Sequence, residues 1–239
     1  MGNNVPAATP LFRSAMGVTL VGGGALGAED LQVSLALAPR LVAADGGAEA
    51  ALAAGLTPEA VLGDMDSLTE AARAQIDPRR IYTIPEQEST DFDKALRHIE
   101  APVVLAAGFT GDRVDHELSV YHALVARRDV RCIVLGARDV VLHAPPNLTL
   151  DVPEGTRISL FPMARVTGLD AGLEWPIEGL VFHPSQRIGT SNRARRAPVR
   201  LSFEGPGMLL ILPRTELAAV VRAVAGASIW SRANADGWV

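Results

Sequence analysis

The chain has 239 residues, of which 48% are apolar and 21% are charged, so a sizeable core can form and wholesale disorder is excluded. The net charge of −5 argues against a general nucleic-acid binder, whose affinity depends on neutralising phosphates. The single cysteine, Cys132, excludes an internal disulfide framework and fits a cytoplasmic location. Residues 16–28 form the nearest approach to a membrane span, but they are too short and too glycine-rich for the roughly 20 apolar residues required, so we expect no membrane partner.

Up to residue 144, short apolar runs alternate with longer amphipathic ones. The short runs predict strands at 17–21, 41–44, 61–62, 80–84, 103–106 and 131–135. The longer ones predict helices at 29–38, 90–99 and 114–126, with a further alanine-rich helix after residue 47. Strands that alternate with helices predict right-handed crossovers. We therefore predict an α/β domain over residues 1–144, with a mostly parallel sheet and helices on both faces.

The pattern changes after Pro145 and Pro146. Short apolar runs now follow one another between glycine, proline and asparagine residues, at 148–150, 157–161, 165–169, 180–182, 199–203 and 208–212. Such spacing is typical of antiparallel strands. Residues 145–239 therefore predict a smaller C-terminal β-sandwich domain, with a final helix at 215–224 and a tail at 225–239 whose role the sequence does not indicate.

Polar clusters follow several of the predicted parallel strands, where ligands bind in open sheets of this kind. Asp64 and Asp66 are the sharpest pair, because two carboxylates one residue apart on a loop can face the same way and bind one hard cation such as Mg²⁺. The alternative is an Asx-turn or a cap for the helix that starts near Leu68. Asp45, followed by two glycines, ends another strand.

Two further clusters open predicted helices. Asp91 can be a third metal-side carboxylate or a residue favoured by the helix dipole, and Lys94 can reach a phosphate or simply pair with Asp91. Arg113 suits bidentate phosphate contact, while Asp115 can position a nucleophile or cap its helix. Each of these motifs has a purely structural interpretation when taken alone.

Six segments together occur in the order and approximate spacing of the thiamine pyrophosphokinase family, which the chain resembles over nearly its whole length. They are Ala44-Asp-Gly-Gly-Ala48, Gly63-Asp-Met-Asp-Ser67, Thr90-Asp-Phe-Asp-Lys-Ala-Leu96, Gly111-Asp-Arg-Val-Asp-His116, Gly172-Leu-Glu-Trp-Pro176 and Gly189-Thr-Ser-Asn192. The chain departs from the family pattern at Asp112, where a glycine is frequent, and at Arg193, where an acidic residue is common.

The resemblance implies an α/β catalytic domain followed by a β-sandwich, and a homodimer with active sites between the first domain of one subunit and the second of the other. It implies transfer of pyrophosphate from ATP to the hydroxyethyl group of thiamine, with release of AMP. By position, Asp64, Asp66 and Asp91 would hold Mg²⁺. Thr90, Arg113 and Asp115 would lie near the nucleotide phosphates and Asp45 near the reacting groups. Trp175, Ser191 and Asn192 would bind thiamine.

The chemistry of these residues agrees with that reaction. Attack on the β-phosphorus needs alignment and charge neutralisation, which clustered aspartates with Mg²⁺, Lys94 and an arginine would supply. The indole of Trp175 offers a cation–π surface to the cationic thiamine. The base that removes the alcohol proton stays open between Asp115 and Asp45. Two alternative functions are a pyrophosphokinase for another hydroxymethyl heterocycle, such as a pterin alcohol, and a non-catalytic sensor of thiamine or nucleotide.

Overall fold

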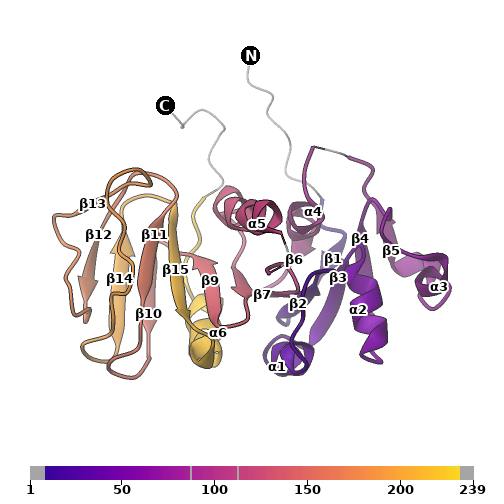
Figure 1. The fold of residues 1–239 in the computed structure, drawn as a ribbon, viewed down its shortest axis with the longest axis horizontal. Helices are drawn as coiled ribbons and strands as arrows, with labels where there is room; N and C mark the ends of the chain where they lie inside the picture. The colour runs from indigo at the N-terminus through magenta and orange to yellow at the C-terminus, as the bar shows by residue number, and fades with distance from the viewer. Residues whose placement is uncertain (1–8, 87, 112, 232–239) are drawn as a thin grey trace, which may run out of the picture.

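Six parallel strands form the larger part of a nine-stranded sheet (Figure 1). In the computed structural model, which describes residues 9–86, 88–111 and 113–231, they are β2 (Val18–Val21), β3 (Arg40–Ala44), β4 (Ala60–Gly63), β5 (Ile81–Thr83), β7 (Val104–Ala107) and β8 (Cys132–Leu135). Their order across the sheet is β8-β7-β2-β3-β4-β5, and each neighbouring pair is parallel. The sequence prediction of an α/β fold is confirmed.

Helices cover both faces of the parallel strands. Helices α4 (Asp91–Arg97) and α5 (Val114–Ala126) share one apolar core with Val42 and Ala44 of β3. Helices α1 (Asp30–Leu37), α2 (Gly47–Ala53) and α3 (Glu70–Arg73) lie on the other side, where Leu31 and Ala48 share a core with Ala43. Successive strand residues point to opposite faces, so every second β3 residue contributes to each core.

The large sheet continues into antiparallel strands. Strand β9 (Asp139–His143) pairs with β8, β15 (Met208–Pro213) pairs with β9, and β11 (Ser159–Pro162) pairs with β15, all antiparallel. A second, antiparallel sheet has the order β10-β14-β12-β13 and consists of β10 (Asn147–Leu150), β14 (Val199–Phe203), β12 (Val166–Ala171) and β13 (Val181–Phe182). Leu148 and Leu201 of this sheet share a core with Leu142, Leu160 and Leu210 of the large one.

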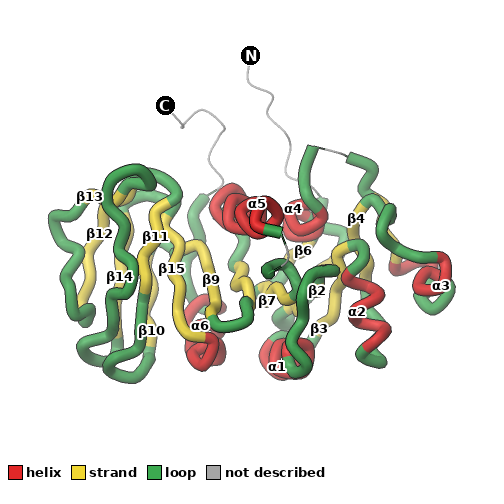
Figure 2. Tube along the Cα trace, in the orientation of Figure 1, coloured by secondary structure: helices red, strands yellow, loops and turns green. Residues whose placement is uncertain are grey.

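The β-sandwich is therefore built onto the α/β sheet rather than beside it. The sequence ends the first series of strands at Leu135, whereas the structure adds β9, which forms a tight turn with β8 through the hydrogen bond from Gly136 N to Asp139 O (2.8 Å). Strands β11 and β15, from beyond residue 144, then extend the same sheet. Figure 2 shows helices α1 to α5 around the parallel strands, while α6 (Leu217–Ala225) lies beside β9 and β10.

The remaining elements are short apart from the last helix. Strand β1 (Phe12–Arg13) pairs with β6 (Ile99–Glu100), and the 3₁₀ turns are η1 (Pro78–Arg80) and η2 (Arg214–Glu216). Helix α6 (Leu217–Ala225) is followed by a segment held by Arg131, which donates to Ala227 O, and by Trp230, whose indole donates to Ala144 O at 2.8 Å. The end of the predicted tail, 232–239, lies outside the described residues. Across the described part of the chain, every helix is too short or too polar to span a membrane.

Candidate active site

The loops that follow β2 and β7 meet where the strand order reverses. The chain runs outward from β2 through β3, β4 and β5 and then returns to β7 on the other side of β2. Two backbone hydrogen bonds join the loops, from Gly22 N to Ala107 O and from Gly24 N to Gly108 O, both 2.8 Å. A Cβ atom on Gly47 would lie 2.1 Å from Val21 O, so glycine allows α2 to begin against β2. Open α/β sheets bind ligands at such a reversal.

A cavity of about 560 Å³ opens at the carboxyl ends of these strands. Its walls include the backbone of both glycine-rich loops and the side chains of three aspartates. Lys94 and Arg113 also contribute to the lining. The cavity is therefore polar and has acidic and basic groups on its surface.

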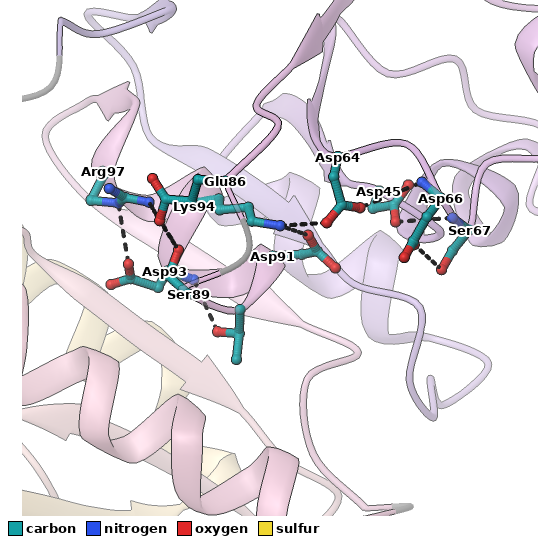
Figure 3. A network of polar contacts seen from close by, with 11 residues as sticks. Asp45, Asp64, Asp66, Ser67, Glu86, Ser89, Asp91, Asp93, Lys94 and Arg97 are labelled. Atoms are coloured by element: carbon teal, nitrogen blue, oxygen red, sulfur yellow. Dashed lines mark hydrogen bonds and ion pairs between the residues drawn. The ribbon is translucent and has the colours of Figure 1, made fainter.

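The three aspartates come from three separate elements. Asp45 follows β3, Asp64 follows β4 and Asp91 is the first residue of α4 (Figure 3). Each offers one carboxylate oxygen, and these oxygens lie within 4.8 Å of one another. The sequence predicted Asp66 as the third member, but the structure groups Asp45 there, and an oxygen of Asp66 accepts a hydrogen bond from Ser67 Oγ (2.9 Å). Asp45, Asp64 and Asp91 form what we call the carboxylate cluster.

Asp45 is the most deeply buried member of the carboxylate cluster. It is 1% exposed, and its backbone has φ of 41°, in the left-handed region that non-glycine residues rarely adopt. Its Oδ2 accepts from Ser67 N (3.2 Å), whereas Oδ1 has no hydrogen-bond donor within the described structure. Burial, together with the Asp66 and Asp91 carboxylates, raises the pKa of Asp45 to about 6. A buried oxygen without a donor, close to two other carboxylates, fits a hard divalent cation.

Lys94 is enclosed with two of these carboxylates. The residue is 2% exposed, and its Nζ lies 2.6 Å from Asp64 Oδ2 and 3.2 Å from Asp91 Oδ1. Burial alone would lower the pKa of Lys94, but the two carboxylates outweigh it and raise that pKa, while Lys94 lowers the pKa of Asp64. Burial raises the pKa of Asp91. The salt bridge to Asp91 left open by the sequence is present, together with a shorter bond to Asp64.

The start of α4 is held by a second set of polar contacts, most of which the sequence does not indicate. Thr90 caps the helix by accepting from Asp93 N (3.4 Å). Arg97 contacts Asp93 at 3.1 Å and Glu86 at 2.6 Å, and it also donates to Ser89 (Figure 3). Asp93 and Arg97 are one helical turn apart, whereas Glu86 and Ser89 precede the helix, so periodicity could not have placed those two.

Arg113 and Asp115 lie at the beginning of α5, outside the carboxylate cluster. Arg113 Nη2 lies 2.7 Å from Asp115 Oδ2, and the two side chains are 65% and 67% exposed. Arg113 lowers the pKa of Asp115 by hydrogen bonding. Arg113 lines the cavity, and Asp115 is absent from the lining formed by the described residues. Asp112, where the chain departs from the family pattern, lies outside the described residues.

The predicted thiamine-binding residues lie in the sandwich part of the molecule. Trp175 belongs to the segment between β12 and β13, which Figure 1 draws at the opposite end of the molecule from β4. Asn192, 6% exposed, donates to Trp175 O (2.7 Å) and accepts from Trp175 N (3.2 Å), so its amide fixes the Trp175 backbone. Arg193 lies over the Trp175 ring, 5.1 Å from its centroid. Within the described structure, Trp175, Ser191 and Asn192 are absent from the cavity lining.

Backbone strain marks the same motifs. Within the described ranges, left-handed backbone occurs at three non-glycine residues: Asp45, Met65 (φ 68°) and Ser191 (φ 65°). Each lies inside a segment that the sequence had singled out. Strained backbone of this kind costs free energy and persists only where surrounding contacts hold it. It is found mostly at functional sites.

The chain is similar to known proteins in both sequence and fold. Residues 32–134 match the family model described as thiamin pyrophosphokinase, catalytic domain. Thiamine pyrophosphokinase 1 of Arabidopsis thaliana is 22% identical over 166 residues, and the match covers 62% of this chain and 62% of that protein. The thiamin pyrophosphokinase structure from Geobacillus thermodenitrificans has a TM-score of 0.66 at 22% identity, covering 83% of this chain and 97% of that one. The structure from Candida albicans has a TM-score of 0.69 at 12% identity, covering 84% and 93%.

The fold and the site define an α/β protein with a carboxylate cluster at the reversal point of a parallel sheet that extends into a β-sandwich. The solved structures share this fold, and the family model spans β3, β4 and the start of α4, which carry all three aspartates. In sequence and fold the chain resembles the thiamin pyrophosphokinases named above. The match spans 62% of the curated relative's length, less than the whole of that protein.

Proposed function

We propose that this protein is a Mg²⁺-dependent thiamine pyrophosphokinase that transfers pyrophosphate from ATP to the hydroxyethyl oxygen of thiamine, giving thiamine diphosphate and AMP. One observation carries the proposal. Three aspartates from separate elements bring carboxylate oxygens within 4.8 Å of one another beside a cavity of about 560 Å³, at the reversal point of the sheet. The similarity of residues 32–134 to the thiamin pyrophosphokinase catalytic domain supports the substrate class.

The donor set suits magnesium. Mg²⁺ prefers oxygen ligands and usually takes one or two carboxylates, completing its shell with water and substrate phosphate. Asp45, Asp64 and Asp91 offer such oxygens, and the buried Asp45 Oδ1 has no donor among the described residues. Asp66, a ligand by resemblance, would act through Ser67 and Asp45 in this geometry. Bound Mg²⁺ would supply neutralisation of the phosphate charge and fix the orientation of the triphosphate.

The protein's own contribution is to align two substrates. Thr90 and Arg113 line the cavity, where they suit the nucleotide phosphates. The alcohol oxygen would bond to the β-phosphorus as the bond to the α,β-bridging oxygen breaks and AMP leaves. Asp45 lies in the cavity and Asp115 does not, so position favours Asp45 over Asp115 as the group near the reacting alcohol.

The proposal includes a homodimer whose subunits share each active site. In one chain the thiamine-binding candidates Trp175, Ser191 and Asn192 do not line the cavity, so a second copy would be needed to bring them to it. Beside the cavity, and sharing Thr110 and Gly111 with it, an apolar hollow of about 440 Å³ lies between α5 and strands β9, β11 and β15. Leu118 and Phe161, which line it, are 59% and 38% exposed. A surface of this kind is typical of protein–protein contacts.

An acceptor panel tests the proposal. AMP release from ATP is measured with thiamine, with a hydroxymethylpterin and with no acceptor, in the presence of Mg²⁺ or of EDTA, and thiamine diphosphate is identified directly. We expect AMP release that requires both thiamine and Mg²⁺. AMP release with the pterin but not with thiamine would show that the acceptor is another hydroxymethyl heterocycle. Binding of thiamine and MgATP without transfer would identify a non-catalytic sensor. A cytoplasmic location stays a prediction.

A further inference from the structure

The carboxylate cluster contacts the only lysine of the chain. Lysine and arginine together number 22, and every one except Lys94 is arginine. Within the described residues, the other ion pairs all use arginine, including the buried contacts of Asp93 with Arg97 and Arg127. A protein that otherwise uses arginine throughout thus has its single ammonium at this one position.

The geometry explains why an ammonium stands there. The Lys94 stem is buried in the first turns of α4, and one nitrogen atom lies within 3.2 Å of an oxygen from each of two carboxylates on different elements. An ammonium donates its hydrogens from a single compact point, whereas a guanidinium is a planar fork that spreads its donors over several atoms. Asp64 and Asp91 therefore converge on one point that an arginine could not reproduce.

The positive charge of Lys94 lies beside three carboxylates that repel one another. Three carboxylates whose oxygens lie within 4.8 Å repel one another strongly at a partly buried site, and a nearby cation offsets that repulsion. We propose that Lys94 is a positioning residue that acts as an internal counter-ion, holding Asp64 and Asp91 together before a divalent cation binds, and does not serve as a phosphate ligand. The inference rests on the proposed metal site and adds a role for the metal-free protein.

Thermal unfolding tests the counter-ion role. The melting temperature of the full chain is measured in EDTA and in excess Mg²⁺ for wild type, Lys94→Met and Arg97→Met, where the last removes a buried cation from the same helix without touching the carboxylate cluster. Loss of a buried ion-pair partner should lower the metal-free melting temperature of both variants by roughly 6–12 °C. We expect excess Mg²⁺ to reduce the difference in melting temperature between wild type and Lys94→Met by at least half. The difference between wild type and Arg97→Met should be the same in Mg²⁺ as in EDTA.

Two results would overturn the inference. If Mg²⁺ stabilises Lys94→Met no more than it stabilises Arg97→Met, Lys94 has a merely structural role. If Lys94→Met melts like wild type in EDTA but requires several-fold more ATP, Lys94 is a phosphate ligand. Absence of any Mg²⁺ effect on wild type would instead contradict the proposed metal site, so the two failures are distinguishable.

A measurement on the wild type serves if Lys94→Met does not fold. Because the chain has one lysine, ¹⁵N-lysine labelling gives a single side-chain Nζ signal. We expect that signal to be visible in EDTA, unchanged on adding ATP with EDTA, and shifted on adding Mg²⁺ alone. A shift with ATP in EDTA would show that Lys94 contacts phosphate and would contradict the counter-ion role.

Discussion

The two candidate halves of the site are built differently. The carboxylate cluster combines three elements, a buried lysine and a strained Asp45 backbone, all enclosed at the carboxyl edge of the parallel strands. The Trp175 segment is local and exposed: Trp175 is 53% exposed, and one buried asparagine fixes its backbone. Like charges do not assemble without support, so a metal site must be preorganised, whereas a stacking surface needs only an accessible ring. Under the proposed function, the rigid half would organise the phosphates and the open half would meet the acceptor.

The largest expected effect concerns the membership of the carboxylate cluster. Asp64→Asn and Asp45→Asn should each lower kcat/KM by about 10²–10³, because each removes a charged ligand from the cluster. Asp66→Asn removes the same charge from a residue outside the cluster. It should lower kcat/KM less than about tenfold, since Asp66 accepts from Ser67 and would act on the cluster only indirectly. Mn²⁺ affinity measured by electron paramagnetic resonance, with AMP-release kinetics, checks all three.

A reversed ranking would contradict this geometry. If Asp66→Asn lost as much Mn²⁺ affinity as Asp64→Asn while Asp45→Asn kept it, the set predicted by sequence would be right. Circular dichroism of each variant controls for misfolding, since all three substitutions preserve side-chain shape.

Mixing inactive variants tests whether the two halves come from different copies. Asp64→Asn and Trp175→Ala are each expected to be weakly active, because the first would weaken metal binding and the second would weaken binding of the acceptor. If each site combines one carboxylate cluster with the partner's Trp175 segment, random mixing leaves about a quarter of the sites intact. Co-refolded mixtures should therefore recover about a quarter of wild-type activity. Activity no greater than the average of the two separate variants would show that each site is formed within one chain.

Arg193 offers a smaller and more specific test of the open half. Its guanidinium lies over the Trp175 ring, on the surface that a cationic acceptor would use. Arg193→Gln should lower the Kd for thiamine about two- to five-fold, because it removes a competing cation–π contact and a like charge. Arg195→Gln is the matched control, since it removes one positive charge two residues further along the chain. Equal effects in calorimetric titrations would assign the change to net charge alone.

Sequence patterns predict local elements better than they predict contacts between distant ones. The strands that carry Asp45 and Asp64, and the helix that begins at Asp91, follow from the alternation of apolar runs and polar loops. The sequence paired Asp64 with Asp66 because two carboxylates one residue apart on a loop can face the same way. Met65 has φ of 68°, in the left-handed region, and the carboxylate oxygens that lie within 4.8 Å of one another belong to Asp45, Asp64 and Asp91.

The sequence could not predict the shared sheet or the Arg193–Trp175 contact, because both depend on which distant segments pair. Strand β9 pairs with β15, some 70 residues away, and only this pairing joins the sandwich to the α/β sheet. Trp175 and Arg193 meet because residues 173 and 194 bridge two antiparallel segments. Apolar periodicity indicates that such segments are strands, and it carries no information about which of them become neighbours.

A last expected effect, on stability alone, lies at the junction of the two halves, where His143 ends β9. Its Nε2 accepts from Gly207 N (2.8 Å), and burial, with Arg128, lowers the pKa of His143 to about 4. The unfolded chain, with a histidine pKa near 6.5, binds the proton first as pH falls, so the free energy of unfolding should fall by about 1–2 kcal/mol between pH 7 and pH 5. Urea unfolding of wild type and His143→Gln measures this, and the variant should lack that part of the slope. Because β9 belongs to the sheet that both halves share, near- and far-ultraviolet signals should report one transition at each pH; two separate transitions would show that the halves unfold independently.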